Sequence, residues 1–199
     1  MRQYACAGGN ALIEPDRIAA VLLAAGRSER FGSDKLLALA DGEPVAVRAA
    51  RQLGSAGSRL RIAVCRGGSP VADLLAASGY EIVVNPDPAR GLSSSLALGI
   101  GRADLAGADA ALVALGDMPF VPASHFGALL AAFDPADAPI VASTRDGAAM
   151  PPALFARAHF ATLCEARGDR GGRALLAGAK LVAATLRELA DIDHPGDLR

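Results

Sequence analysis

The sequence predicts a single-domain α/β fold, a three-layer α/β/α sandwich with a mostly parallel sheet. Short, continuously apolar runs alternate along the chain with longer Ala- and Leu-rich segments. Runs that are apolar at consecutive positions are typical of strands buried on both faces, as in a parallel sheet covered by helices. The length of 199 residues suits one domain, since domains commonly hold roughly 100–200 residues.

The apolar runs and the segments between them give the elements in chain order. The expected strands are Ile18–Ala25, which Gly26 ends, then Leu60–Cys65, Glu81–Val84, Ala110–Leu115, Ile140–Ser143 and a late strand at Leu181–Leu186. The expected helices are Val45–Leu53, Val71–Ala77, Ser94–Arg102, Ser124–Phe133, Ala156–Ala166 and Gly172–Ala177. Residues 1–17 mix Gly, Asn, Pro and charged residues and are expected to form a flexible N-terminal tail, leaving 18–199 as the domain.

Composition excludes several function classes. The formal net charge is -1 and no run of like charge forms a nucleic-acid-binding arm. No apolar window has the length of a membrane span, and the first residues lack the pattern of a signal peptide. Cys6, Cys65 and Cys164 lie far apart without a metal-ligand spacing, which favours reduced thiols. We therefore expect a cytoplasmic protein with neither a nucleic acid nor a membrane as partner.

In an open parallel sheet, ligands bind beyond the carboxyl ends of the strands, near a switch in strand order. The loops after Ala25, Val84 and Leu115 are therefore the places to look for chemistry. The first of these loops combines small residues with nearby cations: Ala24, Ala25, Gly26, Arg27, Arg30 and Lys35. Backbone amides beside such small residues can approach a ligand closely. The pattern is neither a dinucleotide fingerprint nor a Walker P-loop, and composition alone leaves a solvated turn with surface arginines as an equal alternative.

The second and third loops carry polar residues in unusual positions. The second has two prolines, then Gly91 and three consecutive serines, of which helix capping explains one. In the third, an apolar strand is followed by Asp117, and Pro119 then turns the chain away. Asp117 as a helix cap is the alternative, although Ser124 is the better-placed cap. Mg²⁺ is usually held by one or two carboxylates together with substrate phosphates, and Asp117 suits that task.

The segment LAAGRSERFGSDKLL resembles the opening signature LAAGxSxRxGxxKLL of the MobA-like nucleotidyltransferases, and particularly of the molybdenum cofactor cytidylyltransferases. This resemblance implies a Rossmann-like fold of the nucleotide-diphospho-sugar transferase type. It also implies that the first loop holds an NTP, with Leu23, Ala24, Ala25, Gly26 and Lys35 binding the nucleotide. Lys35 and Arg27 or Arg30 then act in catalysis on the phosphates.

Other motifs extend the resemblance to the chain end. Gly91, Ser95 and Gly99 match a G-x-x-x-S-x-x-x-G pattern, which implies nucleotide contacts from Gly91, Ser94 and Ser95. The stretch GDMP is similar to the family's metal-binding G-D-x-P motif, and DIDHPGDL to its closing D-I-D-T-P-E-D-L. The resemblance thus implies that Asp117 and Asp193 hold Mg²⁺, with Mn²⁺ as an alternative ion. A polar C-terminal turn remains the alternative for Asp193.

The acceptor side shows departures from the family. GDRGGRALL resembles the element G-D-x-G-A-R-x-L-L of the cytidylyltransferase branch, which implies acceptor binding by Asp169 and Arg173. Gly172 replaces the usual alanine there. Met150 stands where the family has a glycine before a proline. Methionine adds bulk and does not readily adopt positive φ, so this position bears on the shape of the acceptor pocket.

These resemblances imply an enzyme that transfers CMP from CTP to the phosphate of molybdopterin and releases pyrophosphate. CTP is favoured over GTP because the Ala-Ala-Gly at the start of the first motif and the GD-x-G-x-R element both resemble the CTP-using branch of the family. The partners are then an NTP and a phosphorylated pterin, with a molybdoenzyme client as a further candidate. A guanylyltransferase or a sugar- or polyol-phosphate nucleotidyltransferase on the same scaffold remains open. So does a noncatalytic carrier or maturation factor for the molybdenum cofactor.

Overall fold

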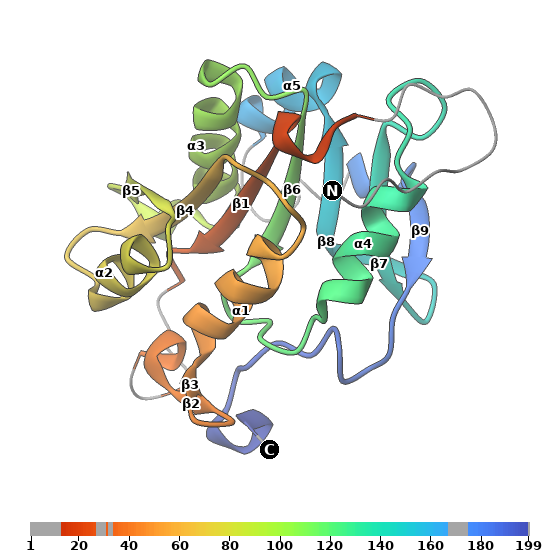
Figure 1. Cartoon of the computed structure of the whole chain (residues 1–199). Helices are drawn as coiled ribbons and strands as arrows, with labels where there is room; N and C mark the ends of the chain where they lie inside the picture. Colours follow the sequence, from red (N-terminus) through yellow and green to blue (C-terminus); the bar gives the residue numbers. More distant parts are fainter. Residues whose placement is uncertain (1–12, 27–30, 32–33, 167–174, 199) are drawn as a thin grey trace.

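The computed structural model describes residues 13–26, 31, 34–166 and 175–198. Its main sheet has seven strands in the order β5-β4-β1-β6-β8-β7-β9 (Figure 1). The strands are β1 (Ile18–Ala24), β4 (Arg61–Arg66), β5 (Glu81–Asn85), β6 (Ala110–Leu115), β7 (Ile140–Arg145), β8 (Ala148–Ala156) and β9 (Lys180–Ala183). The short strands β2 (Leu39–Ala40) and β3 (Glu43–Pro44) form a separate hairpin.

Helices cover both faces of the sheet, as the sequence predicted. They are α1 (Val45–Gly54), α2 (Pro70–Ala77), α3 (Leu92–Leu105), α4 (Ala123–Ala132) and α5 (Phe160–Glu165). Helices α1, α2 and α4 bury apolar side chains in a core on one face, whereas α3 and α5 bury theirs in a second core on the other. Strand β1 contributes to both cores, because its alternate residues point to opposite faces. All seven of its residues are buried. The three-layer α/β/α prediction is thus confirmed.

The pairing pattern confirms a mostly parallel sheet with one exception. Strand β1 runs parallel to both β4 and β6, and β7 runs parallel to β9. Strand β8 is antiparallel to its neighbours β6 and β7. The chain passes from β1 to β4 and β5 on one side, and β6 lies on the other side of β1. The strand order therefore reverses at β1 and β6, the kind of place where open α/β sheets bind ligands.

Strand β8 corrects the prediction of a helix at Ala156–Ala166. The strand extends to Ala156, the 3-10 turn Arg157–His159 follows, and the helix begins only at Phe160. No strand was predicted at Ala148–Ala156, a run that contains two prolines. They are accommodated where the β7–β8 register shifts: Ala142 pairs with Ala153, whereas Ser143 pairs with Met150. At such a bulge a missing proline N–H leaves no ladder bond unmade.

The remaining expected elements differ from the structure mainly at their ends. Helix α3 begins at Leu92 rather than Ser94, and α4 begins at Ala123, with Pro122 rather than Ser124 as its N-cap. The first half of the helix expected at Gly172–Ala177 lies outside the described residues. The 3-10 turn Pro15–Arg17 precedes β1. The boundary expected after residue 17 stays a prediction.

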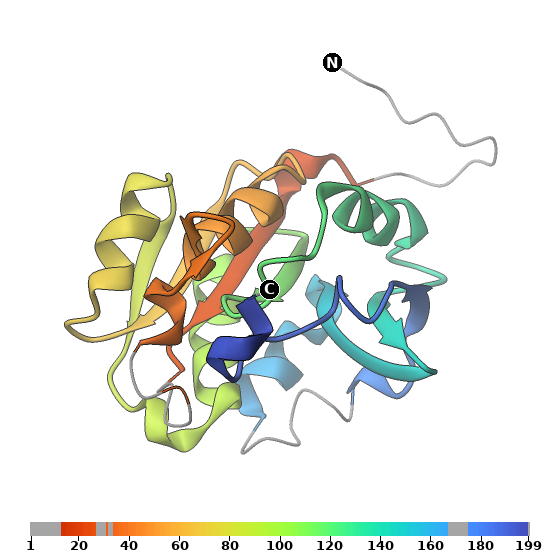
Figure 2. The ribbon, with the colours of Figure 1, turned by 90° about the horizontal axis from the view of Figure 1, so that it is seen from below.

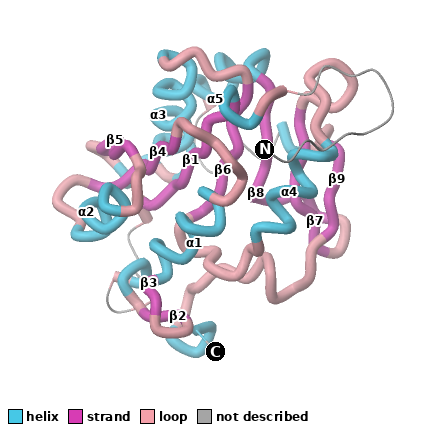
Figure 3. The backbone as a smooth tube through the Cα atoms, in the orientation of Figure 1, coloured by secondary structure: helices cyan, strands magenta, loops and turns pink. Residues whose placement is uncertain are grey.

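The segment after β9 returns to the carboxyl ends of the central strands. Figures 1 and 2 show it passing below the sheet toward the hairpin of β2 and β3. Most of it is loop (Figure 3), and it ends in the 3-10 turn Pro195–Leu198. Leu189 and Ile192 have no exposed surface and belong to the core under α1 and α4. Burial of these two side chains fixes the path of the chain end beneath the sheet.

Among the described residues, no helix combines the length and the apolar character that crossing a bilayer requires.

Candidate functional site

The first loop leaves β1 at the point where the strand order reverses. Ala25 is 4% exposed, and a Cβ placed on Gly26 would meet nothing within 4 Å. The chain then reaches the 3-10 turn Lys35–Leu37, which Asp34 caps by accepting a hydrogen bond from the amide of Leu36 at 3.3 Å. Arg66, at the end of β4, forms an ion pair with Asp34. The neighbouring strand therefore anchors the turn that carries Lys35.

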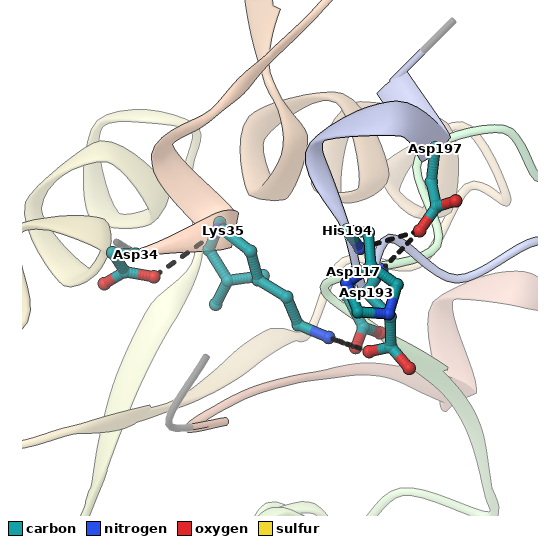
Figure 4. A network of polar contacts seen from close by, with 7 residues as sticks. Asp34, Lys35, Asp117, Asp193, His194 and Asp197 are labelled. Atoms are coloured by element: carbon teal, nitrogen blue, oxygen red, sulfur yellow. Dashed lines mark hydrogen bonds and ion pairs between the residues drawn. The ribbon is translucent and has the colours of Figure 1, made fainter. Parts of the chain in front are cut away.

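The ammonium group of Lys35 lies between two carboxylates that come from distant parts of the chain. Its Nζ is 2.8 Å from Asp117 Oδ2 and 2.9 Å from Asp193 Oδ1 (Figure 4). The Lys35 side chain is 11% exposed, against 23% for Asp117 and 37% for Asp193. The two acidic side chains therefore converge on one cationic atom, which is partly withdrawn from solvent.

A close approach of β6 to β1 delivers Asp117. The amide of Gly116 donates a hydrogen bond to the carbonyl oxygen of Leu23 at 2.9 Å. A Cβ on Gly116 would lie 3.2 Å from both Leu23 O and Ala24 Cβ. Glycine thus lets the end of β6 lie against the first loop, so Asp117 follows directly beside the residues that open that loop.

Backbone contacts on both sides of Asp193 hold this residue beside Asp117. The preceding amide, that of Ile192, donates to the carbonyl oxygen of Asp117 at 2.9 Å. The amides of Asp193 and His194 both donate to Asp197 Oδ2, at 3.0 and 2.7 Å. The C-terminal segment is therefore attached both to the strand tip that carries Asp117 and to its own final turn.

Opposing charges set the electrostatics of this cluster. Burial by itself lowers the pKa of Lys35, but the attraction of Asp117 and Asp193 outweighs it, and the pKa lies above the ordinary lysine value. The backbone amides of His194 and Asp193 hold the pKa of Asp197 below its usual value. At neutral pH the ammonium is charged.

A cavity of about 390 Å³ opens over the three charged residues, a size suited to a small-molecule ligand. Most of the residues assigned from the sequence to nucleotide and metal line it: Leu23, Ala24, Ala25, Gly26, Lys35, Gly91, Ser95, Asp117 and Asp193. Ser94 does not. Its hydroxyl is 2.9 Å from Asn85 Nδ2 and it lines a separate hollow of about 300 Å³. Ser95 also bonds to Asn85, at 2.9 Å, so both serines help to attach α3 to the end of β5.

Several cavity residues were not identified from the sequence. Phe31, Leu36, Leu92 and Leu115 add an apolar wall to the cavity. Their positions inside or beside the loop motifs were a usable signal, but apolar residues there also suit a core. Leu92 is 46% exposed and so presents apolar surface at the cavity. The cavity thus pairs one apolar side with the charged cluster.

Four assigned residues lie outside the described part of the chain: Arg27, Arg30, Asp169 and Arg173. Their assignments stay predictions. Met150 is described, and it lies in β8 paired with Ser143. The described non-glycine residues with positive φ are Asp41 and Asp146, so Met150 does not carry the backbone angle that the family glycine suggested. Nor does Met150 line the cavity at Lys35.

The described residues contain no cluster of three or more His, Cys, Asp or Glu side chains able to hold a metal ion. A pair of carboxylates is nevertheless enough for Mg²⁺, which keeps several waters and binds substrate phosphates. The Lys35 ammonium shows that oxygens of Asp117 and Asp193 can share one cation at contact distance. This donor set is hard and purely oxygen, and it fits Mg²⁺ or Mn²⁺.

Comparisons with known proteins show the family to which this chain belongs. The model of the MobA-like NTP transferase domain matches residues 20–187. The chain belongs to this family. A curated relative, the purine catabolism protein PucB of Bacillus subtilis, is 31% identical over 189 residues, covering 88% of this chain and 91% of PucB.

Solved structures with similar folds agree with the family assignment. A nucleotidyl transferase from Methanothermobacter thermautotroptrophicus is 26% identical, with a TM-score of 0.77 over 90% of this chain and 93% of that one. The Mycobacterium sp. strain JC1 homologue of Mycobacterium tuberculosis Rv0371c is also 26% identical, with a TM-score of 0.76 over 92% and 94% of the two chains. The chain is thus a MobA-like nucleotidyltransferase with the Rossmann-like fold of that family.

Proposed function

We propose that this nucleotidyltransferase transfers CMP from CTP to the terminal phosphate of molybdopterin, with release of pyrophosphate. One observation carries the proposal: a lysine ammonium and two carboxylates meet on the wall of a ligand-sized cavity, directly beside the small residues of the first loop. A lysine ammonium together with a carboxylate-bound cation suits a polyphosphate chain, and a glycine-containing loop suits close approach of its oxygens.

In the proposed reaction an oxygen of the acceptor phosphate attacks the α-phosphorus of CTP. A new P–O bond forms as the bond between the α-phosphorus and the bridging oxygen breaks, and the electron pair leaves with pyrophosphate. The acceptor phosphate is already ionised near neutral pH, so no side chain has to act as nucleophile. The protein's work is to hold two mutually repelling anions in line and to stabilise the charge of the leaving group.

Each described residue has a role in this scheme. Lys35 stabilises negative charge on the β- and γ-phosphates, and its contact with two carboxylates keeps it protonated for that purpose. Asp117 and Asp193 hold Mg²⁺ or Mn²⁺, which when bound neutralises phosphate charge. The backbone at Ala24, Ala25 and Gly26 lines the cavity where the triphosphate lies.

The preference for CTP rests on the Ala-Ala-Gly opening, and the pterin acceptor rests on the resemblance of residues 168–176 to the cytidylyltransferase element. The proposed function implies a molybdoenzyme as client and a cytoplasmic location. In that compartment Cys65 and Cys164 stay as free thiols. A guanylyltransferase, or a transferase acting on a sugar or polyol phosphate, uses the same cavity and charged cluster. A noncatalytic carrier does not need them.

The test is pyrophosphate release by the full chain with Mg²⁺, molybdopterin and each of the four NTPs in turn. CTP should give the highest rate. K35A should lower the rate by about 100-fold or more, because a charge stabiliser at the phosphates is lost. K180A is the matched control, since Lys180 is an exposed lysine on the edge strand β9. Binding of CTP and pterin without any pyrophosphate release would instead identify a carrier, and a higher rate with GTP would contradict the CTP assignment.

A further inference from the structure

The final turn of the chain contains Asp197, whose carboxylate accepts hydrogen bonds from the backbone next to the carboxylate of Asp193 in the site. Asp197 lies in the 3-10 turn Pro195–Leu198 and is exposed to solvent. Its Oδ2 accepts hydrogen bonds from the amides of Asp193 and His194, at 3.0 and 2.7 Å (Figure 4). In return, the amide of Asp197 donates to the carbonyl oxygen of His194 at 3.0 Å. The turn is thus closed from both directions.

These bonds matter because they fix Asp193 from its C-terminal side. The Asp193 side chain is 37% exposed, and its carboxylate contacts Lys35 at 2.9 Å. On the N-terminal side, the Ile192 amide is bonded to the carbonyl oxygen of Asp117 and the Ile192 side chain is buried. On the C-terminal side, Asp197 holds the Asp193 amide itself. The backbone of Asp193 is therefore held on both flanks, and its side chain is aimed at Lys35.

We propose that Asp197 is a positioning residue for the carboxylate of Asp193, and thereby for binding of a divalent cation at Asp117 and Asp193. The inference rests on the proposed function in one respect, that these two carboxylates hold the metal. The hydrogen bonds of Asp197 Oδ2 go to backbone amides, so this residue acts through the Asp193 backbone. Groups that orient metal ligands in this way commonly change metal affinity by about 10–100-fold when they are removed.

Two variants separate the hydrogen bonds of Asp197 from its charge, which Lys35 also attracts. In D197N, the carboxamide oxygen can accept both amide hydrogens, since a carbonyl oxygen has two lone pairs, while the negative charge is lost. In D197A, both the acceptor and the charge are lost. If Asp197 works by orienting Asp193, D197N resembles the wild type. If it only adds negative charge near the cation, D197N resembles D197A.

The matched control for charge is D191A, because Asp191 is an exposed carboxylate of the same C-terminal segment. Its removal changes the local charge as D197A does, but leaves the turn at Asp193 intact. A thermal unfolding curve for each variant verifies that the fold is present. The exposed position of the final turn makes a large loss of stability unexpected for any of the three.

The experiment titrates Mn²⁺ into the full chain, without nucleotide and again with CTP, and follows free Mn²⁺ by electron paramagnetic resonance. We expect the Mn²⁺ dissociation constant to rise about 10-fold in D197A and to stay within about 2-fold of wild type in D197N and D191A. In turnover assays, D197A should raise the metal concentration needed for half-maximal rate more than it lowers kcat.

An unchanged dissociation constant in D197A would overturn the inference, and so would equal losses in D197A and D197N. These results would leave the proposed metal site intact as long as the wild type binds Mn²⁺ and D193N does not. A wild-type protein that binds no Mn²⁺ would instead refute the metal site of the proposed function, and the role of Asp197 with it.

Discussion

Replacing Gly99 with alanine tests whether the absence of a side chain at this position is needed for the packing of α3 on the sheet. Gly99 lies within α3 and faces the two strands β1 and β4. A Cβ at this position would lie 2.5 Å from Val21 Cγ1 and 3.1 Å from Val64 Cγ2. Real Cβ atoms do not approach that closely, so the helix or a valine must move. Both valines are fully buried, and their β-branched side chains have few alternative rotamers.

Two opposing terms decide the size of the effect. Alanine has the higher helix propensity, by about 1 kcal/mol over glycine. Overpacking a filled core costs about 1–3 kcal/mol. Because a Cβ at 2.5 Å from Val21 Cγ1 is a severe overlap, the overpacking cost should lie in the upper part of its range and exceed the gain in helix propensity. We therefore expect G99A to lower the free energy of unfolding by about 1–2 kcal/mol. For a domain of this size, that corresponds to a Tm about 2–8 °C lower.

The same helix provides the control. A Cβ on Gly101 would meet nothing within 4 Å, so G101A gains helix propensity without a clash and should raise Tm by about 2–4 °C. Thermal unfolding of the two variants, followed by circular dichroism in the same buffer, gives the comparison. A Tm that rises equally in G99A and G101A would refute the role of packing.

Two further predictions concern buried polar groups. Burial, which outweighs the nearby Glu188 carboxylate, lowers the pKa of His125, whose Nε2 is 2.8 Å from Ser143 Oγ. As the pH falls, His125 is therefore protonated in the unfolded chain before it is protonated in the folded protein. The free energy of unfolding should thus fall as pH drops below about 6.5. His125→Gln should flatten Tm against pH between about pH 5 and 8; parallel curves would contradict this. The Tyr80 hydroxyl donates to Ala50 O at 2.8 Å, so Tyr80→Phe should cost about 1 kcal/mol in urea unfolding, and an unchanged midpoint would disprove that contribution.

Much of the fold follows from local sequence, and strand β8 marks the limit of local prediction. Long buried strands such as β1 and β6 were predicted within a residue of their ends, because continuous apolar runs of this length are typical of strands buried on both faces. The sequence did contain a signal for β8. Asp146 and Gly147, both with positive φ, form a two-residue turn between β7 and β8. An Asp-Gly pair is a strong hairpin indicator, but Pro151 and Pro152 obscured the strand that follows it.

Some residues of the functional site could likewise be predicted from a local motif, whereas others depend on contacts between distant parts of the chain. The first loop is one contiguous motif, so its residues could be assigned to a common cavity from sequence. Asp193 could be assigned only through family resemblance, because its contact with Lys35 spans 158 residues. No local pattern indicates that Leu189 and Ile192 are buried in the core that α1 and α4 cover, yet this burial brings Asp193 to Asp117.

The cluster of Lys35, Asp117 and Asp193 therefore forms only when the tertiary fold brings three distant parts of the chain together, whereas the first loop is one contiguous segment. Lys35 is positioned by its own turn and by Arg66 at the end of the adjacent strand. Asp117 follows the end of β6, one residue beyond a glycine that lies against β1. Asp193 arrives last along the chain, attached through the Ile192 amide to Asp117 and through its own amide to Asp197. Because hydrogen bonds to both Asp117 and Asp197 hold this segment, small changes in the exposed final turn should shift the Asp193 carboxylate relative to the ammonium group of Lys35. Substrate-binding properties of this protein should thus be sensitive to its last residues, although these lie far along the chain from the motif that identifies the family.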